Sequence, residues 1–192
     1  IIDYQRRAKY ILIHLSNNLS LIWHMGMSGR VKISDTKPTT IEKHDHIILE
    51  TTNGWVTYND ARRFGVFTYC ETNRLNEHPL LKKIGLEPFD EKLTDAYLRN
   101  RFQKKNVPIK VALLDQEIVT GIGNIYASET LYLAGIDPTR PAKDISADEC
   151  GILLSSFRKV LSDAIAAGGS TLKDYQKPDG SLGYFQNLHC VY

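Results

Sequence analysis

The spacing of hydrophobic residues changes near residue 85, and this change constrains the fold more than any other feature of the chain. Before that point, short apolar runs are separated by turn signals, which is typical of antiparallel strands. They lie at residues 9–15, 19–25, 30–34, 46–51, 55–58 and 64–70. After it, apolar residues recur at helical spacing, and helices are expected at residues 93–102, 108–114, 124–134 and 146–167. The sequence therefore predicts an α+β fold, with an antiparallel β-sandwich followed by a helical domain.

Turn residues and helix signals suggest where the domains end. Asn, Pro and Gly cluster between the two patterns, so we expect a sandwich domain at 1–75, a linker at 76–90 and a helical domain at 91–192. The longest helix has a capping-box start at Ser146 and Glu149 and a stop signal at Gly168-Gly169.

Composition excludes several classes of protein. The hydrophobic fraction of 42% and charged fraction of 24% are ordinary for a globular protein, and no apolar run approaches a membrane span. The chain has three cysteines and no Cys-x-x-Cys pair, which argues against a disulfide scaffold and against a four-cysteine zinc site. We therefore expect a protein of a reducing compartment, with no membrane partner and no metal ligands among these residues.

The distribution of charge is more informative than the net charge of +2. Residues 1–33 carry five basic side chains and one acid, and residues 99–110 carry five basic side chains and no acid. Positive stripes on a nearly neutral chain suit a polyanion bound on one face, although solvated surface segments would give the same pattern.

Three glycine-marked segments carry the residue types that bind nucleic acid. The sequence Gly-Ile-Gly-Asn opens a predicted helix at Asn124, where backbone N–H groups suit a phosphate; a capped turn without ligand is the alternative. Arg62, Arg63 and Phe64 lie in a predicted turn, from which they would insert into a duplex, unless Phe64 is buried in the next strand. Met27 lies between glycines and is either a second probe or a core residue.

A fourth segment, residues 168–184, is a long loop marked by glycine and proline. A loop of this length in a compact domain is typically a lid or a binding segment, and disorder is the competing interpretation.

Taken together, these segments resemble the bacterial formamidopyrimidine-DNA glycosylase family, also called Fpg or MutM. The similarity covers essentially the whole chain, in order: QRRAKYILIHL at 5–15, HMGMSG at 24–29, EKHDHIIL at 42–49, DARRFG at 60–65, LLDQEIVTGIGNIYASE at 113–129 and GGSTLKDYQKPDGSLGYFQNLHCVY at 168–192. One departure is Ala61, where the family commonly has proline, which would loosen the turn that aims Arg62.

The resemblance implies a role for particular residues. The sandwich would be the catalytic domain, the helical domain would hold a helix–two-turn–helix motif, and DNA would bind in the basic cleft between them. Lys9 matches a catalytic lysine, and Met27, Arg62 and Phe64 match the trio that fills the void left by a flipped nucleotide. Positions that match DNA contacts are His44, Arg62, Arg63, Lys105 and Asn124. Positions that match the loop for oxidised guanine are Ser170, Thr171, Lys173 and Tyr184.

The resemblance also implies chemistry. The family's N-terminal proline attacks C1′ of an 8-oxoguanine or formamidopyrimidine nucleotide, expels the base through a Schiff base, and cuts the strand by elimination. This sequence begins Ile1-Ile2-Asp3 and ends at Tyr192, so we expect the proline helix and the zinc finger of the family to lie outside it. These residues alone are then expected to be inactive and to bind no cofactor, with one structural zinc only in a full-length protein. The expected partner is double-stranded DNA with oxidised purines, bound by a monomer in the bacterial cytoplasm and nucleoid.

Two other functions fit parts of the sequence. An endonuclease-eight-like glycosylase for oxidised pyrimidines would share GIGNIYASE, but would not be expected to combine it with RRAKY, the Met–Arg–Phe trio and the long loop. A non-catalytic protein that binds damaged duplex would keep the binding residues without the nucleophile.

Overall fold

The computed structural model describes residues 1–170 and 183–192, which form two compact units. Unit 1 comprises Ile1–Thr72 with Ala167–Asn187, and unit 2 comprises Asn73–Ala166 with Leu188–Tyr192. The chain thus passes from one unit to the other at Thr72, close to the predicted end of the sandwich. Of the described residues, 167–170 and 183–187 group with the strands, whereas the predicted division had assigned them to the helical domain.

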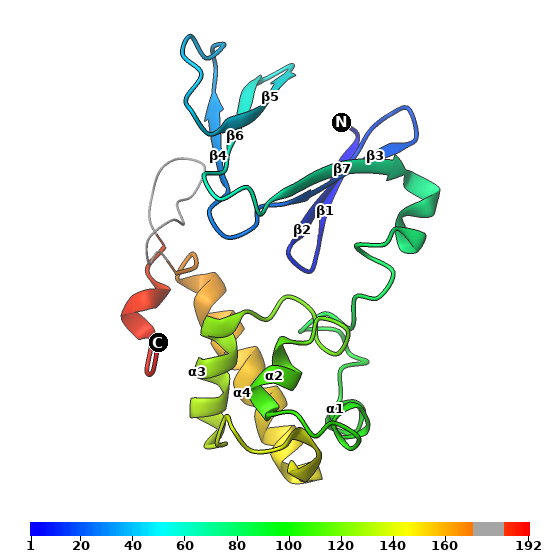
Figure 1. Cartoon of the computed structure of the whole chain (residues 1–192), viewed down its shortest axis with the longest axis vertical. Helices are drawn as coiled ribbons and strands as arrows, with labels where there is room; N and C mark the ends of the chain where they lie inside the picture. Colours follow the sequence, from blue (N-terminus) through cyan, green and yellow to red (C-terminus); the bar gives the residue numbers. More distant parts are fainter. Residues whose placement is uncertain (171–182) are drawn as a thin grey trace. The chain divides into compact units, whose positions relative to one another are not determined.

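Unit 1 contains two antiparallel sheets, as the alternating pattern predicted (Figure 1). The four-stranded sheet has the order β1-β2-β3-β7 and the three-stranded sheet the order β4-β6-β5. The strands are β1 (Asp3–Arg7), β2 (Tyr10–His14), β3 (Leu19–His24), β4 (Arg30–Ser34), β5 (Asp45–Thr51), β6 (Gly54–Asn59) and β7 (Val66–Glu71).

Strand β1 was not predicted. Its sequence, DYQRR, is polar and mostly exposed, so it carries no apolar alternation. It forms because it pairs with β2 along its whole length, from Asp3 opposite His14 to Arg7 opposite Tyr10. Backbone pairing, rather than burial of side chains, therefore defines this edge strand.

The two sheets meet at an aromatic cluster. Trp23 of β3 packs edge-on against Tyr58 of β6 at 5.3 Å between ring centroids, and against Phe67 of β7 at 5.2 Å. This contact places the three-stranded sheet against the four-stranded one and forms the centre of the sandwich.

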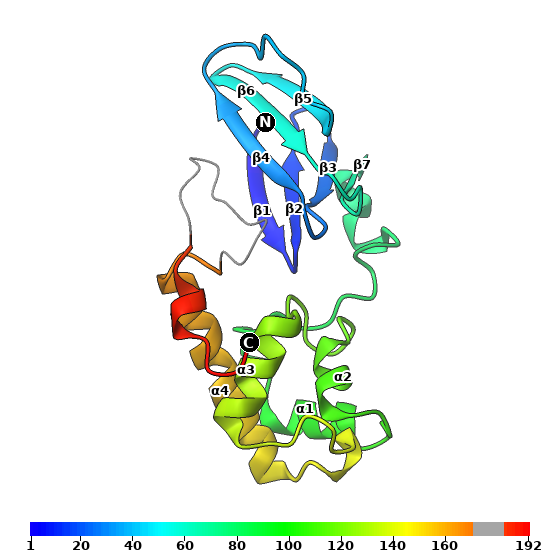
Figure 2. The same cartoon turned by 60° about the vertical axis from the view of Figure 1, so that its left-hand side comes forward.

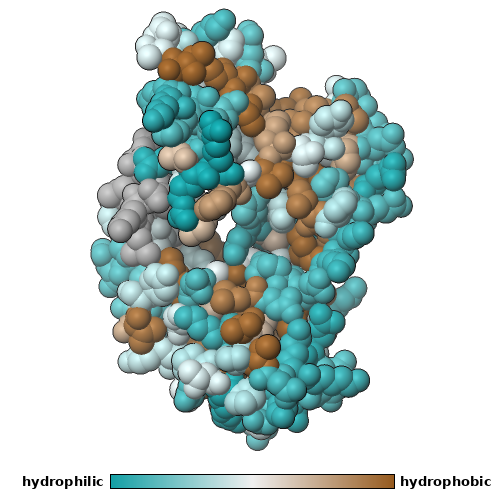
Figure 3. Space-filling model, in the orientation of Figure 1, coloured by the Kyte–Doolittle hydropathy of each residue, from teal (hydrophilic) through white to brown (hydrophobic). Residues whose placement is uncertain are grey.

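Part of the four-stranded sheet is exposed in the described structure. Apolar residues gather over the region of this sheet in the space-filling view (Figure 3). Its exposed apolar side chains include Tyr4, Ile11 and Tyr69.

Unit 2 is helical, and its helices follow the predicted ranges closely. They are α1 (Asp95–Phe102), α2 (Ile109–Leu114), α3 (Asn124–Ala134) and α4 (Ala147–Ala166), with short 3₁₀ helices at Thr72–Glu77, at its start, and at Ala142–Asp144. A further 3₁₀ helix, Phe185–Leu188, belongs mostly to unit 1. Helices α3 and α4 lie side by side (Figure 2). The large cluster of buried apolar residues, from Leu93 to Leu161, lies entirely in this unit. None of the helices in the described ranges is both long enough and apolar enough to span a membrane.

Local capping sets the helix ends. The Thr94 side chain accepts the Tyr97 N–H at 3.1 Å at the start of α1. At the start of α4, Ser146 and Glu149 form the predicted capping box, in which each side chain accepts the N–H of the other residue. Gly135 ends α3 in the left-handed conformation, with φ of 66°.

Candidate nucleic-acid interface

Two loops of unit 1 carry the predicted probing residues, and the topology brings these loops together. Residues 25–29 connect β3 to β4, and residues 60–65 connect β6 back to β7, so both loops pass from one sheet to the other. Both pairs of flanking residues are also paired in the sheets: His24 lies opposite Val66, and Arg30 opposite Asn59. We name loop 25–29 the Met27 loop and loop 60–65 the Arg62 loop.

The backbones of the two loops are in close contact, which explains their glycines. A Cβ atom on Gly26 would lie 2.6 Å from the Gly65 nitrogen and 2.6 Å from the Phe64 carbonyl carbon. A Cβ on Gly65 would overlap the Tyr58 hydroxyl. Larger residues at these positions would force the loops apart.

The predicted probing side chains point away from this contact. Met27 is 67% exposed and Phe64 is 58% exposed, so neither is a core residue. The Arg62 guanidinium lies over the Phe64 ring, with its central carbon 5.0 Å from the ring centroid. The two alternative interpretations, a buried Met27 and a buried Phe64, are therefore wrong.

Arg63 adopts a conformation that is rare for a residue with a side chain, with φ of 57°. It lies between Arg62 and Phe64, and its side chain is exposed. The left-handed backbone at Arg63 reverses the chain inside the Arg62 loop and leaves the side chains on both sides of it exposed.

A buried carboxylate lies beneath these side chains. Asp60 is 1% exposed and accepts hydrogen bonds from the Ser28 hydroxyl at 2.6 Å and the Gly65 N–H at 2.8 Å. The Tyr58 hydroxyl lies 3.1 Å from the same carboxylate. Burial alone would raise the pKa of Asp60, but these hydrogen bonds outweigh burial and the pKa is lowered. The carboxylate is thus ionised and stabilised by hydrogen bonds at neutral pH.

Lys9 lies in the two-residue turn that joins β1 and β2. Ala8 precedes it, is buried, and has φ of 54°, an uncommon conformation for alanine. More than a third of the Lys9 surface is exposed, yet desolvation by nearby protein atoms lowers the pKa of its ammonium group. The turn thus presents a lysine that loses its proton more readily than an ordinary one.

His24, which was not among the predicted site residues, connects this turn with the Met27 loop. The centroids of the His24 and Tyr10 rings are 4.9 Å apart, and the His24 Nδ1 accepts the Gly26 N–H at 3.0 Å. Burial and the nearby Lys9 charge lower the pKa of His24. The imidazole is therefore neutral at pH 7, which the Gly26 hydrogen bond requires.

His44 lies immediately before β5 and is partly buried. Its carbonyl accepts the Asp60 N–H at 3.0 Å, and the His46 ring bonds the Asp60 carbonyl at 2.8 Å. Backbone contacts thus place His44 next to the Arg62 loop.

In unit 2, Asn124 is exposed at the first position of α3. The turn before it is fixed by Gln116, whose amide donates to the carbonyls of Leu114 and Ile122 and whose oxygen accepts the Gly121 N–H. Gly121 has φ of 83°, which favours glycine. This fixed turn presents the start of α3, which has the polarity and the backbone donors to hold a phosphate.

The basic stripe at residues 99–110 is used partly within unit 2. The Lys105 ammonium lies 2.8 Å from the Asp115 carboxylate, and Arg99 and Arg101 donate to the carbonyls of Lys143 and Glu117. Lys105 would therefore have to share its charge between Asp115 and a phosphate. Three of the five basic side chains in this stripe thus have partners within unit 2.

Glu129 was also not predicted as a site residue. It is 4% exposed on α3, and its carboxylate accepts the backbone N–H groups of Cys190, Val191 and Tyr192 at 2.8 to 3.1 Å. The helix that carries Asn124 thus also anchors residues 190–192. The only sign of this role in the sequence is that Glu129 is an acidic residue within a mostly apolar helix.

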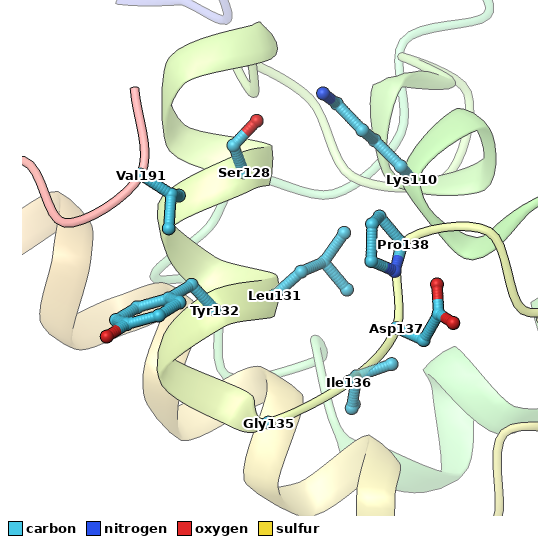
Figure 4. A pocket seen from close by; sticks show the side chains of 9 residues that line it. All are labelled: Lys110, Ser128, Leu131, Tyr132, Gly135, Ile136, Asp137, Pro138 and Val191. Atoms are coloured by element: carbon cyan, nitrogen blue, oxygen red, sulfur yellow. The ribbon is translucent and has the colours of Figure 1, made fainter.

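A pocket of about 520 Å³ lies farther along α3 (Figure 4). It is lined by Ser128, Leu131 and Tyr132 of the helix, with Lys110 and Val191 at its edge. These residues come from later turns of α3 than Asn124, so the pocket is separate from the start of the helix.

The predicted lesion loop is described only at its two ends. The Tyr184 and Phe185 N–H groups donate to the carbonyls of Ala167 and Gly169, at 3.0 and 2.9 Å. These bonds bring Ser170 and Tyr184 near each other, and Tyr184 is 62% exposed. Thr171 and Lys173 lie outside the described residues.

Two models of known protein families match this chain. Residues 1–67 match the model of the formamidopyrimidine-DNA glycosylase N-terminal domain, and residues 84–176 match the formamidopyrimidine-DNA glycosylase H2TH domain, the helix–two-turn–helix element. The formamidopyrimidine-DNA glycosylase of Dinoroseobacter shibae is 45% identical over 100% of this chain and 71% of its own length. That of Novosphingobium aromaticivorans is 47% identical over 97% of this chain and 68% of its own length.

Solved structures agree. The MutM (Fpg) protein of Thermus thermophilus superposes with a TM-score of 0.91 at 36% identity, over 100% of this chain and 71% of that one. Fpg of Lactococcus lactis bound to DNA with an abasic site gives a TM-score of 0.88 at 33% identity, over 97% of this chain and 68% of that one.

The fold and these matches define a class: DNA-binding glycosylases of DNA repair that combine a β-sandwich with a helix–two-turn–helix element. Within this class, the chain belongs to the formamidopyrimidine-DNA glycosylase family.

Proposed function

We propose that this chain recognises oxidised purines, such as 8-oxoguanine and formamidopyrimidines, in duplex DNA, as part of a bifunctional glycosylase and lyase. The observation that carries the proposal is the pair of contacting loops that expose Met27, Arg62 and Phe64 together. Two apolar side chains and a guanidinium on one rigid support suit the gap that a flipped nucleotide leaves, because they replace both stacking and hydrogen bonding.

The solved relatives support this choice of substrate. A point mutant of Lactococcus lactis Fpg is known bound to DNA that contains Fapy-dG, and Lactococcus lactis Fpg is known bound to DNA that contains an abasic site. It is also known bound to DNA with an oxidised pyrimidine. Oxidised pyrimidine duplex therefore belongs in any test of lesion preference.

For the lyase step we propose Lys9 as a group that moves a proton. Its pKa is lowered by desolvation, so a larger fraction of its amine is neutral at pH 7 than for a lysine with the ordinary pKa. The nucleophilic amine that expels the base in this family is an N-terminal proline, which is not one of these 192 residues. We therefore expect these residues by themselves to bind damaged duplex without releasing the base.

Zinc is assigned to none of these residues. Within the described ranges, no three His, Cys, Asp or Glu side chains gather closely enough to hold a metal ion. No step of the proposal passes through a metal.

The test is to incubate the 192-residue chain with duplexes that carry 8-oxoguanine, an oxidised pyrimidine or an abasic site, with borohydride to trap any Schiff base. Binding to the 8-oxoguanine duplex in preference to the undamaged one, without a covalent adduct, is the expected result. A covalent adduct on 8-oxoguanine duplex would show that another amine acts as nucleophile. Equal affinity for damaged and undamaged duplex would overturn the proposal, and preference for the pyrimidine lesion would favour the endonuclease-eight-like alternative.

A further inference from the structure

Asp60 and Ser28 join the two probing loops into one rigid element. Ser28 is 8% exposed, although its neighbour Met27 is 67% exposed, so the Met27 loop turns one side chain inward and the next one outward. The inward Ser28 hydroxyl donates to Asp60 across the two loops at 2.6 Å.

The same hydroxyl also organises the Arg62 loop. Its oxygen accepts the Arg62 N–H at 3.1 Å, so Ser28 contacts the backbone of the residue whose side chain lies over Phe64. The second carboxylate oxygen of Asp60 accepts the Gly65 N–H at 2.8 Å and thus closes the Arg62 loop onto its own first residue.

Asp60 is in turn fixed from the three-stranded sheet. Its N–H donates to the His44 carbonyl at 3.0 Å, and its own carbonyl bonds the His46 ring at 2.8 Å. Each polar group of Asp60 therefore has a partner, and the partners come from both loops, from Tyr58 of β6 and from residues 44 and 46 at the start of β5.

From this arrangement we infer that Asp60, acting through Ser28, is a positioning residue for damage recognition: it fixes the Met27 loop against the Arg62 loop, so that Met27, Arg62 and Phe64 enter the duplex as one unit. Neither Asp60 nor Ser28 would touch the DNA, because both are buried. The inference rests on the proposed role of the three exposed side chains.

A structural role alone and a positioning role have different consequences. Phosphate contacts carry most of the affinity for undamaged duplex, and they do not depend on how the Met27 loop lies against the Arg62 loop. Insertion into the gap in a damaged duplex does depend on the relative position of the two loops, because Met27, Arg62 and Phe64 must fit into one space. Loss of the link should therefore reduce the preference for damaged duplex more than it reduces binding as such.

The experiment uses the full 192-residue chain and a duplex with one tetrahydrofuran abasic analogue, with 2-aminopurine in the opposite strand as a reporter of insertion. The variants are Asp60→Asn and Ser28→Ala. Ser20→Ala is the matched control, since Ser20 is a fully buried serine at the other end of β3 that bonds His14 and Thr72. Undamaged duplex is measured in parallel, and a thermal melt reports folding.

We expect Ser28→Ala and Asp60→Asn to weaken binding to the abasic duplex about tenfold and to reduce the 2-aminopurine signal, with undamaged duplex affected less than about twofold. Ser20→Ala should keep the preference for damaged duplex, whatever its effect on the melting temperature. If Asp60→Asn fails to fold, Ser28→Ala decides the question, because it keeps the buried carboxylate with its Gly65 bond.

A Met27→Ala/Phe64→Ala double variant distinguishes the role of the exposed side chains from the positioning role of Asp60. If it retains the preference for abasic duplex, the proposed function of the loops fails. If it loses the preference while Ser28→Ala and Asp60→Asn retain it, the loops recognise damage but Asp60 does not position them, and the present inference is overturned.

Discussion

Single residues in this chain show why contact partners matter more than residue type. In the sequence, His24 lies between Trp23 and Met25, and these neighbours by themselves indicate no role for it. In the fold, its ring packs on Tyr10, its Nδ1 accepts the Gly26 N–H, and the Lys9 charge lies close to it. Protonation would add a hydrogen to the accepting nitrogen and place two positive charges near each other, so the neutral ring is the form compatible with the Met27 loop.

The pH dependence of unit 1 should therefore have a component from His24. Its folded pKa is lower than the ordinary value of 6.5, so the unfolded chain binds more protons below about pH 6.5 and stability falls as the pH falls. His24→Gln should reduce this loss between pH 7.5 and pH 5, as measured by tryptophan fluorescence melts. His78→Gln, in unit 2, is the control and should leave the slope unchanged; an unchanged slope in His24→Gln would contradict the assignment.

At the scale of elements, helix ends are fixed locally while helix functions depend on distant segments. The start of α4 shows the first case, because Ser146 and Glu149 cap each other within one turn and Arg140 adds a charged partner to Glu149. Helix α3 shows the second case. Its first residue is the candidate phosphate site, while Glu129 on the same helix binds residues 190–192, some sixty positions away in sequence.

The cap of α4 makes a measurable prediction. The Arg140 hydrogen bond, with smaller contributions from Ser146, lowers the pKa of Glu149 to about 2 from 4.5. Glu149→Ala should cost about 1 kcal/mol of unfolding free energy at pH 7. The contribution of Glu149 is complete above pH 4.5 and is lost as the pH falls toward about 2, so the two proteins should converge in stability over that range.

Denaturant titrations followed by circular dichroism would measure this difference. Asp148→Asn is the control, because Asp148 lies in the same first turn but is exposed, and its removal should cost only a few tenths of a kcal/mol. Equal losses in the two variants would show that the helix dipole, and not the cap, is responsible.

At the scale of the whole molecule, burial is unevenly divided. The large apolar cluster belongs to unit 2, whereas unit 1 has its aromatic contact at Trp23 and exposes Tyr4, Ile11 and Tyr69 on its four-stranded sheet. Because burial of apolar surface is the main favourable contribution to folding, unit 1 should be the less stable unit.

This difference can be observed with natural probes. Both tryptophans, Trp23 and Trp55, lie in unit 1, while the four α-helices found in the described residues lie in unit 2. Tryptophan fluorescence should therefore report a melting transition at least about 5 °C below the one seen by circular dichroism at 222 nm. Coincident transitions would mean that the two units unfold together.

Much of the fold followed from local sequence. The ranges of the helices and of β2 to β7 were predicted to within about two residues, because capping side chains, glycine stops and apolar spacing act over a few positions. Strand β1 was missed because its polar sequence is held by backbone pairing with β2. The exposed states of Met27 and Phe64 were left open by the sequence and decided by the structure.

The sequence by itself determined the fold class, the helix ends and the residue types of the candidate interface, because these depend on short-range preferences and on motifs that resemble one family. Only the tertiary structure decided which loops lie together. The Met27 and Arg62 loops are some thirty-five residues apart, and they meet because β3 pairs with β7 and β4 with β6. Asp60 and Ser28 acquired their roles in the same way: a buried carboxylate needs hydrogen-bond donors, and those donors come from segments that only the folded chain brings within reach.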